Sequence, residues 1–293
     1  MNKVIVIYGP TAVGKSAIAV ELAKIIDGEI ISADSMQIYK GLDIGSAKVT
    51  LDEMQGIKHH LIDIKEPSED YSVAEFCENA KRIIPEIISR CKTPIIVGGT
   101  GLYLKSLISN YDFDNTEKSQ IFRNSLKGLS NEEIYNKIIE LDPNAEIDIN
   151  NRHRLIRKLE KLTMPTKQSQ NSKNDFEYIL FAIYDDRQKI YDRINARVDK
   201  MVENGLLQEA KYLLSLNLSE DNLAMKAIGY KELFGYLRGE CTLEQSKELL
   251  KQKTRNYAKR QFTFMNQFPN RIDVDFAGVK QTSLNIAKII GEN

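Results

Sequence analysis

The residues that first suggest chemistry form a loop close to the start of the chain. Residues 9–16 read GPTAVGKS and match the phosphate-binding pattern G-x-x-x-x-G-K-[ST] at every required position. Glycines in such a loop permit the backbone angles that turn successive N–H groups toward phosphate oxygens. Lys15 would place its ammonium on the terminal phosphate oxygens, and Ser16 would ligate Mg²⁺. The predicted phosphate-binding residues are Gly9, Pro10, Thr11, Ala12, Val13, Gly14, Lys15 and Ser16.

An aspartate further along the chain is the second candidate. Asp34 ends the strand-like run at 29–34, and ligands of open parallel sheets bind beside the carboxyl ends of strands. Three roles for its carboxylate stay open from the residues alone: ligating metal, accepting a proton, or capping the loop. Asp63 also ends a strand-like run, so the second Mg²⁺-holding aspartate of an ATP-hydrolysing enzyme is only suggested.

The elements around the loop determine how its residues are held. VIVIY at 4–8 is typical of a buried strand, and AIAVELAKII at 17–26 has helical periodicity. This strand, loop and helix order favours a functional phosphate site over a simple glycine-rich turn. Further strands are predicted at 29–34, 60–64, 93–99 and 177–184, with a helix at 73–90. The alternation predicts an α/β fold, a P-loop NTPase-like parallel sheet flanked by helices.

Composition changes in the middle of the chain indicate a second domain. Polar runs and few β-branched residues distinguish the region from about residue 112 to 176, which we interpret as a helical insertion domain. We expect residues 1–111 and 177–293 to form the P-loop catalytic core, which ends in a helical C-terminal part.

The overall composition is that of a globular protein. The chain has 293 residues, of which 42% are hydrophobic and 28% charged, and 41 basic residues balance 41 acidic ones. Any contact with nucleic acid must therefore use local basic patches. The cysteines Cys77, Cys91 and Cys241 are widely spaced, which favours a reducing, cytoplasmic location, and no segment reaches the ~20 apolar residues of a membrane helix.

Several longer blocks resemble one enzyme family. The phosphate loop is followed by SADSMQIYKGLDIGSAK (32–48), HHLIDIKEPSEDYSVAEF (59–76), VGGTGLYLKSL (97–107), AIGYKEL (227–233) and TRNYAKRQFT (254–263). Together and in this order they are similar to the tRNA dimethylallyltransferase family. The resemblance implies a monomeric, Mg²⁺-dependent prenyltransferase. Such an enzyme moves a dimethylallyl group from dimethylallyl diphosphate to N6 of the adenine immediately 3′ of the tRNA anticodon, at position 37, and releases diphosphate.

The resemblance also implies catalytic roles. The loop would hold the leaving diphosphate through Lys15 and Ser16-bound Mg²⁺, and Asp34 would hydrogen-bond N6–H and take its proton. Thr100 would touch the nucleotide, although capping the helix that follows is an alternative, and both roles are compatible. The family also uses an arginine from the helix after the insertion. Arg193 and Arg197 are both candidates, since positions i and i+4 share a helix face.

The resemblance further indicates which residues contact tRNA. They fall in the DSMQ segment, at Thr100, and in the insertion, where RHRLIRKLEK (152–161) places several basic residues on one helical face. A merely solvated face is the alternative for this charged run. The predicted tRNA-binding residues are Asp34, Ser35, Met36, Gln37, Thr100, Arg123, His153, Arg154, Leu155, Ile156 and Arg157.

Some positions depart from the family pattern. Asn151 replaces a common acidic residue, TMPTKQSQ (163–170) replaces a Gly-Lys-Pro turn, and Phe264 stands where the family often has tryptophan. We interpret His59 and His60 as structural residues, because no third metal ligand is evident. Alternative functions are an enzyme that prenylates free adenine nucleotides, a small-molecule kinase, and a nucleotide-sensing regulator without enzymatic activity.

Overall fold

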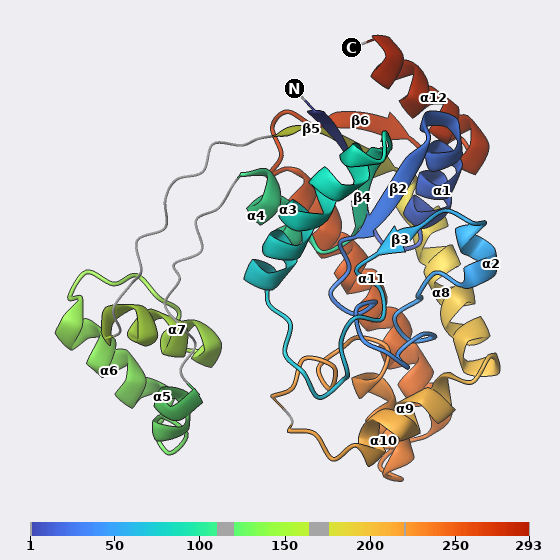
Figure 1. Cartoon of the computed structure of the whole chain (residues 1–293). Coiled ribbons are helices and arrows are strands. Elements are labelled where there is room, and N and C mark those ends of the chain that lie inside the picture. The colour runs from blue at the N-terminus through green and yellow to red at the C-terminus, as the bar shows by residue number, and fades with distance from the viewer. Residues whose placement is uncertain (1, 110–119, 164–175, 220, 293) are drawn as a thin grey trace. The chain divides into compact units, whose positions relative to one another are not determined.

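The computed structural model describes residues 2–109, 120–163, 176–219 and 221–292 (Figure 1). The chain divides into two compact units: Met1–Ser109 with Asn174–Asn293, which we call the core unit, and Asn110–Lys173, which we call the insertion unit. Of the predicted departure at 163–170, all but Thr163 lies outside the described residues. No helix of the described ranges is long and apolar enough to cross a membrane.

One sheet of parallel strands forms the centre of the core unit. Its strand order is β3-β2-β4-β1-β5-β6, and every neighbouring pair is parallel, which confirms the predicted α/β fold class. The strands are β1 (Asn2–Tyr8), β2 (Gly28–Ser32), β3 (His59–His60), β4 (Thr93–Gly98), β5 (Phe176–Tyr184) and β6 (Ile272–Asp275). Residues 4–8 of β1 are fully buried, because β4 and β5 flank the strand within the sheet and helices cover both faces, as its apolar run predicts.

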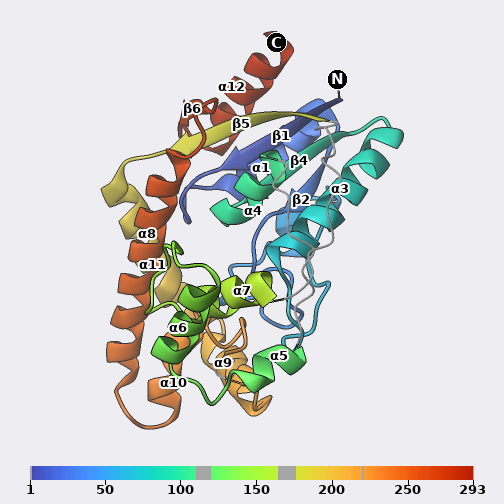
Figure 2. The same cartoon turned by 90° about the vertical axis from the view of Figure 1, so that its left-hand side faces the viewer.

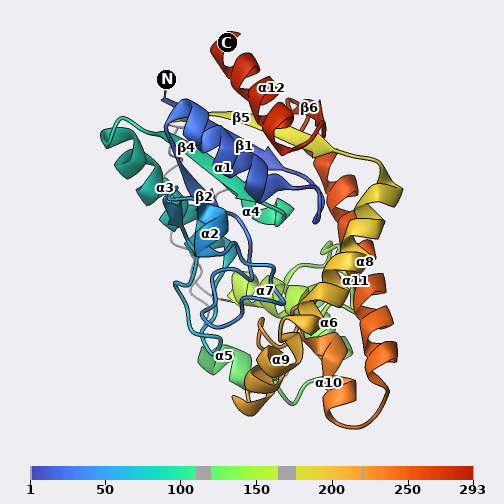
Figure 3. The ribbon, with the colours of Figure 1, turned by 90° about the vertical axis from the view of Figure 1, so that its right-hand side faces the viewer.

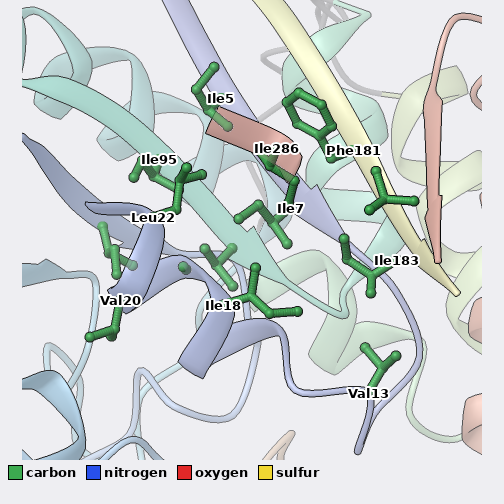
Figure 4. Packing of buried hydrophobic residues seen from close by; sticks show 14 of the residues in the cluster. Ile5, Ile7, Val13, Ile18, Val20, Leu22, Ile95, Phe181, Ile183 and Ile286 are labelled. Atoms are coloured by element: carbon green, nitrogen blue, oxygen red, sulfur yellow. The ribbon is translucent and has the colours of Figure 1, made fainter. Parts of the chain in front are cut away.

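Helices cover both faces of this sheet. Helices α1 (Lys15–Ile26) and α12 (Val279–Glu292) pack on one face, and α3 (Val73–Ser89) and α4 (Gly101–Ile108) lie on the other (Figures 2 and 3). Figure 4 shows the first of these layers, where Ile18 and Leu22 of α1 and Ile286 of α12 meet Ile7 and Ile95 of the sheet. All five side chains are fully buried, so this layer fixes the helix that follows the phosphate loop.

The remaining helices of the core unit lie mainly beyond the carboxyl ends of the strands (Figure 1). They are α2 (Leu51–Met54), α8 (Arg187–Glu203), α9 (Leu206–Ser215), α10 (Lys231–Leu237) and α11 (Leu243–Met265). Gly205 connects α8 to α9 with a φ of 107°, a conformation that disfavours side chains. Helix α11 spans much of the unit and packs against α8, α10 and α4, so one helix contacts both the sheet layer and the outer helices.

The insertion unit has a hydrophobic core of its own. Its helices are α5 (Gln120–Ser125), α6 (Asn131–Leu141) and α7 (Arg152–Thr163). Ile134 and Ile138 of α6 pack against Leu155 and Leu159 of α7. The start of α6 is fixed by a capping box between Ser130 and Glu133.

Two sequence predictions about strands need correction. The strand expected at 60–64 ends at His60, because Leu61 and Asp63 have positive φ angles of 61° and 54° that turn the chain away from the sheet. Asp63 therefore does not end a strand, and its carboxylate accepts a hydrogen bond from Lys48. The strand expected at 29–34 ends at Ser32, which leaves Asp34 in the loop beyond it.

Glu209 of α9 holds the LDIGSAK segment (residues 42–48) in place. Its carboxylate accepts hydrogen bonds from the backbone N–H groups of Asp43, Ile44 and Gly45, each at 2.9 Å, and from the hydroxyl of Tyr230 at 2.6 Å. A Cβ at Gly45 would lie 2.5 Å from the Tyr230 ring, so only glycine fits there. Two distant motifs, LDIGSAK and AIGYKEL, are thus structural partners joined by one carboxylate.

Replacing this carboxylate should destabilise the protein. In Glu209→Gln the new NH₂ group faces backbone donors, and we expect the free energy of unfolding to fall by about 2 kcal/mol. Urea denaturation measures the change, and the exposed Glu203→Gln in α8 provides a matched control with the same change of charge. Equal stability of the two variants would contradict the role assigned to Glu209.

Candidate active site

The phosphate loop connects β1 to α1, as its sequence predicts. Gly14 precedes the first residue of α1 with a φ of 96°, and Ala12 has a φ of 63°. A Cβ at Gly9 would lie 2.8 Å from the carbonyl oxygen of Ile183, so β5 approaches the loop too closely for a side chain. The ammonium of Lys15 donates a hydrogen bond to the carbonyl oxygen of Pro10 at 2.8 Å. The loop therefore closes around Lys15.

A cavity of about 610 Å³ opens beside this loop in the core unit. The residues that line it come from the phosphate loop, from the segment after β2, from the end of β4 and from α8. They include most of the predicted catalytic and phosphate-binding residues, namely Thr11, Ala12, Gly14, Lys15, Ser16, Asp34 and Arg197, and also the predicted tRNA-binding residue Gln37. Residues far apart in the sequence thus face one space of the size of a small-molecule site.

Two opposite charges in this cavity influence each other. Burial lowers the pKa of Lys15 to about 7, although the negative charge of Asp34 partly offsets the effect. Burial likewise raises the pKa of Asp34, against a hydrogen bond of 2.9 Å that its Oδ1 accepts from the N–H of Met36. Both groups are therefore poorly solvated, and an anion that enters beside Lys15 would favour its charged form.

Thr100 lies next to Asp34 but does not line the cavity. It occupies the N-cap position of α4, yet its hydroxyl makes no capping hydrogen bond. The hydroxyl oxygen instead accepts a hydrogen bond from the N–H of Ser35 at 3.2 Å. Of the two roles considered for Thr100, side-chain capping is not observed, and its hydroxyl fixes the loop that contains Asp34.

The two candidate arginines of α8 have different surroundings. Arg193 donates a hydrogen bond to the carbonyl oxygen of Ala12 at 3.0 Å, forms an ion pair with Asp185 and stacks over Phe276. Arg197 lines the cavity, and burial lowers its pKa. Arg193 therefore braces the phosphate loop from outside the cavity, whereas Arg197 faces the space itself.

The cavity contains oxygen atoms of the type that a magnesium ion binds. Within the described ranges no cluster of three His, Cys, Asp or Glu residues could hold a metal. The hydroxyl of Ser16 and the carboxylate of Asp34 nevertheless line the same space. Mg²⁺ prefers oxygen ligands and commonly uses one or two protein groups together with phosphates and water.

Part of the cavity wall consists of residues that no sequence motif indicated. The segment after the DSMQ residues contributes Asp43, Lys48 and Thr50, α8 contributes Lys200, and Asn204 follows directly after α8. The Lys48 ammonium is nearly buried and donates to Asp43 and Asp63, both at 2.5 Å, and to the Tyr39 carbonyl oxygen. The LDIGSAK segment belongs to a family block, which indicated that it matters. Its residue spacing did not indicate that it lines the cavity.

His59 and His60 have structural partners, which supports their interpretation as structural residues. His60 Nε2 lies 2.7 Å from a carboxylate oxygen of Glu29, which also forms a two-point ion pair with Arg90. These partners hold the pKa of Glu29 at about 2 despite its burial. His59 Nδ1 lies 2.8 Å from the carbonyl oxygen of Ile57.

The predicted tRNA-binding residues of the insertion unit have unequal exposure. Arg123 and Arg157 both form ion pairs with Glu160, whose side chain is fully buried. Leu155 is also fully buried in the core of the unit, so its side chain is not available to a ligand, and Ile156 packs against the same core. Arg154 is exposed on α7. The side chain of His153 lies outside the described residues.

Comparisons with known proteins agree with this architecture. The family model described as IPP transferase matches residues 37–268. A tRNA dimethylallyltransferase of Acetivibrio thermocellus is 47% identical over 283 residues, which span 92% of this chain and 90% of that protein.

Solved structures give the same result. The tRNA isopentenylpyrophosphate transferase of Bacillus halodurans has a TM-score of 0.77 at 40% identity. The alignment covers 100% of this chain and 96% of that chain. A eukaryotic dimethylallyltransferase, described as acting on tRNA, has a TM-score of 0.83 at 29% identity, covering 99% of this chain and 78% of its own. The phosphate loop, the parallel sheet and these matches together place the chain in the IPP transferase family.

Proposed function

We propose that the protein transfers a dimethylallyl group from dimethylallyl diphosphate to N6 of the adenine immediately 3′ of the anticodon in tRNA, and releases diphosphate. It would act in the cytoplasm, as a monomer. The observation that carries the proposal is one cavity that contains both a phosphate-binding loop and a poorly solvated carboxylate, Asp34, in a chain of this family.

The phosphate loop would hold the leaving group. The N–H groups at the start of α1 and the ammonium of Lys15 favour negative charge, and Arg197 faces the same space. As the bond between C1 and oxygen breaks, negative charge accumulates on the diphosphate and positive charge on the allylic carbon. Fixed donors at that place would stabilise the departing group more than the bound substrate.

Asp34 would serve the other substrate. An exocyclic adenine amine is a weak nucleophile, so a carboxylate within hydrogen-bond distance of N6–H is needed to remove a proton as the new N6–C1 bond forms. Thr100 and the backbone N–H of Met36 hold the loop and the carboxylate in position. The raised pKa of Asp34 makes it a stronger base than an exposed aspartate.

Magnesium would act on the diphosphate side of the cavity. We propose Ser16 as its protein ligand, with diphosphate oxygens and water completing the shell. The ion would neutralise charge on the leaving group.

The insertion unit would bind the anticodon region of the tRNA. Arg154 is our first candidate for a phosphate contact, because it is exposed, whereas Arg123 and Arg157 both pair with Glu160. Ser35, Met36 and Gln37 would contact the target nucleotide, which must leave the base stack to reach Asp34.

A transfer assay tests the proposal. The protein is incubated with Mg²⁺ and labelled dimethylallyl diphosphate, and either unmodified tRNA or AMP is offered as acceptor. We expect label to move to tRNA only. Transfer to AMP alone, or to neither acceptor, would refute the proposed function and favour a nucleotide prenyltransferase or a non-enzymatic protein.

Removing the carboxylate of Asp34 should slow the reaction without weakening tRNA binding. For Asp34→Asn we expect kcat to fall by roughly 100-fold or more, since general base catalysis contributes about 10²–10⁴-fold. The exposed Asp52→Asn should retain full activity. A large rise in the tRNA Kd of Asp34→Asn, with little change in kcat, would show that Asp34 serves the fold or binding instead.

The low pKa of Lys15 predicts a pH dependence of diphosphate binding. The free ammonium loses its proton as pH rises through about 7, and bound diphosphate favours the protonated form. Affinity for pyrophosphate should therefore fall between pH 7 and pH 9, with proton uptake at pH 8. Calorimetry in buffers of different ionisation enthalpy measures this uptake. Lys15→Arg stays charged at these pH values, so equal proton uptake by the two proteins would exclude Lys15 as its source.

Substitutions of the two arginines of α8 should affect different properties, pyrophosphate affinity for Arg197 and stability for Arg193. Arg197→Gln removes a charge from the cavity, so we expect pyrophosphate affinity to fall by about tenfold or more with the melting temperature nearly unchanged. Arg193→Gln removes the brace on Ala12 and the partner of Asp185, so we expect mainly a lower melting temperature. The reverse pattern would assign the cavity role to Arg193.

A further inference from the structure

A buried glutamine on α11 joins two loops that are far apart in the sequence. Gln261 is 3% exposed. Its Oε1 accepts a hydrogen bond from the backbone N–H of Thr11 at 2.7 Å, and its Nε2 donates to the carbonyl oxygen of Gly99 at 2.8 Å. The backbone carbonyl oxygen of Gln261 also accepts a hydrogen bond from the hydroxyl of Tyr8 at 3.2 Å. One side chain thus connects the phosphate loop with the turn after β4.

The surroundings of this amide leave little freedom for movement. A Cβ at Gly99 would lie 2.1 Å from Gln261 Nε2, so the glycine permits the close approach. One helical turn earlier, the Tyr257 hydroxyl donates to the same Gly99 carbonyl oxygen at 3.3 Å and bonds with Thr100. The guanidinium of Arg260 lies 5.6 Å from the centre of the Tyr257 ring.

The two loops belong to opposite sides of the proposed reaction. Thr11 lies in the loop that would hold the diphosphate. Gly99 precedes Thr100, whose hydroxyl holds the N–H of Ser35 beside Asp34. Burial raises the pKa of Tyr257 and the negative charge of Asp34 raises it further, so this tyrosine lies within electrostatic reach of the carboxylate. The relative position of these loops therefore sets the distance between the leaving group and the base.

We propose that Gln261 is a positioning residue, whose side-chain amide fixes the separation between the phosphate loop and the turn at Gly99–Thr100. The inference rests on the proposed transfer reaction and deepens it. Group transfer requires the nucleophile, the carbon and the leaving group to be aligned, and a displacement of about 1 Å can lower the rate by about 10²-fold. Gln261 acts through Thr11 and Gly99 and touches neither substrate.

A substitution of similar shape tests whether the amide is needed. Gln261→Met keeps an unbranched side chain but forms neither hydrogen bond. We expect kcat to fall by roughly 10- to 100-fold while KM for tRNA changes less than about threefold. Gln267→Met provides the control, because Gln267 is an exposed glutamine whose side chain accepts a hydrogen bond from Lys105. An unchanged kcat in folded Gln261→Met would overturn the inference.

A second variant gives a readout that loss of packing would not produce. In Gln261→Glu the protonated carboxyl can accept from Thr11 N–H and donate to the Gly99 oxygen, whereas the ionised carboxylate can only accept. The ratio of its kcat to that of the unmodified protein should therefore rise severalfold as pH falls from 8 to 5. This ratio cancels the titration of Asp34, and melting temperatures at each pH identify any unfolding.

The outcomes separate the inference from the proposed function. Transfer by the unmodified protein together with a pH-independent activity ratio for Gln261→Glu would overturn the positioning role alone. A ratio that follows the melting temperature would also overturn it. Absence of transfer by the unmodified protein would overturn both the proposed function and the inference. A ratio that rises at low pH without a change in stability would support Gln261 as the link.

Discussion

The site depends on the order of the strands, in which β4 separates β2 from the central β1. Because the strands are parallel, the loops after β1, β2 and β4 leave the sheet at the same edge. Those loops contain the phosphate-binding residues, Asp34 and Thr100 respectively. The end of β4 and the loop after β2 approach each other closely, since a Cβ at Gly98 would lie 2.1 Å from the carbonyl oxygen of Ala33. Larger side chains at the end of β4 would separate the catalytic loops.

Desolvation then determines how the gathered charges behave. Lys15, Asp34 and Arg197 have pKa values displaced toward their neutral forms, mainly because the protein removes them from water. Such groups are costly to bury without a partner. An anionic substrate would supply that partner for the two cations, so the energy spent on burial favours binding of diphosphate. In a base, the same effect increases affinity for a proton.

Glu209 and Gln261 show how the outer helices support the site. The carboxylate of Glu209 binds backbone N–H groups of the LDIGSAK segment, and Gln261 bridges the phosphate loop and the turn after β4. Neither residue lines the cavity. In the insertion unit a buried carboxylate pairs with charged side chains instead of backbone groups. Glu160 forms ion pairs with both Arg123 and Arg157 and offsets one of their two positive charges, so the unit presents fewer available charges than its basic residues alone indicate.

The sequence by itself determined the features that depend on local motifs and on periodic patterns of residue types. The glycines and Lys15 of the phosphate loop, the apolar run of β1 and the alternation of strands and helices predicted the loop, its flanking elements and the parallel sheet. Local rules were sufficient there, because hydrogen bonding and side-chain periodicity act between near neighbours. The same rules overextended β3, since they did not indicate the positive φ angles at Leu61 and Asp63.

Only the tertiary structure separated Arg193 from Arg197, because two residues on one helix face are equivalent until their neighbours are known. It also showed that Leu155 and the partners of Glu160 serve the insertion core. The sequence did not indicate the role of Gln261, because its two side-chain hydrogen bonds span 250 and 162 residues. Contacts of that range depend on how helices pack against a sheet, and no local pattern of residue types encodes them.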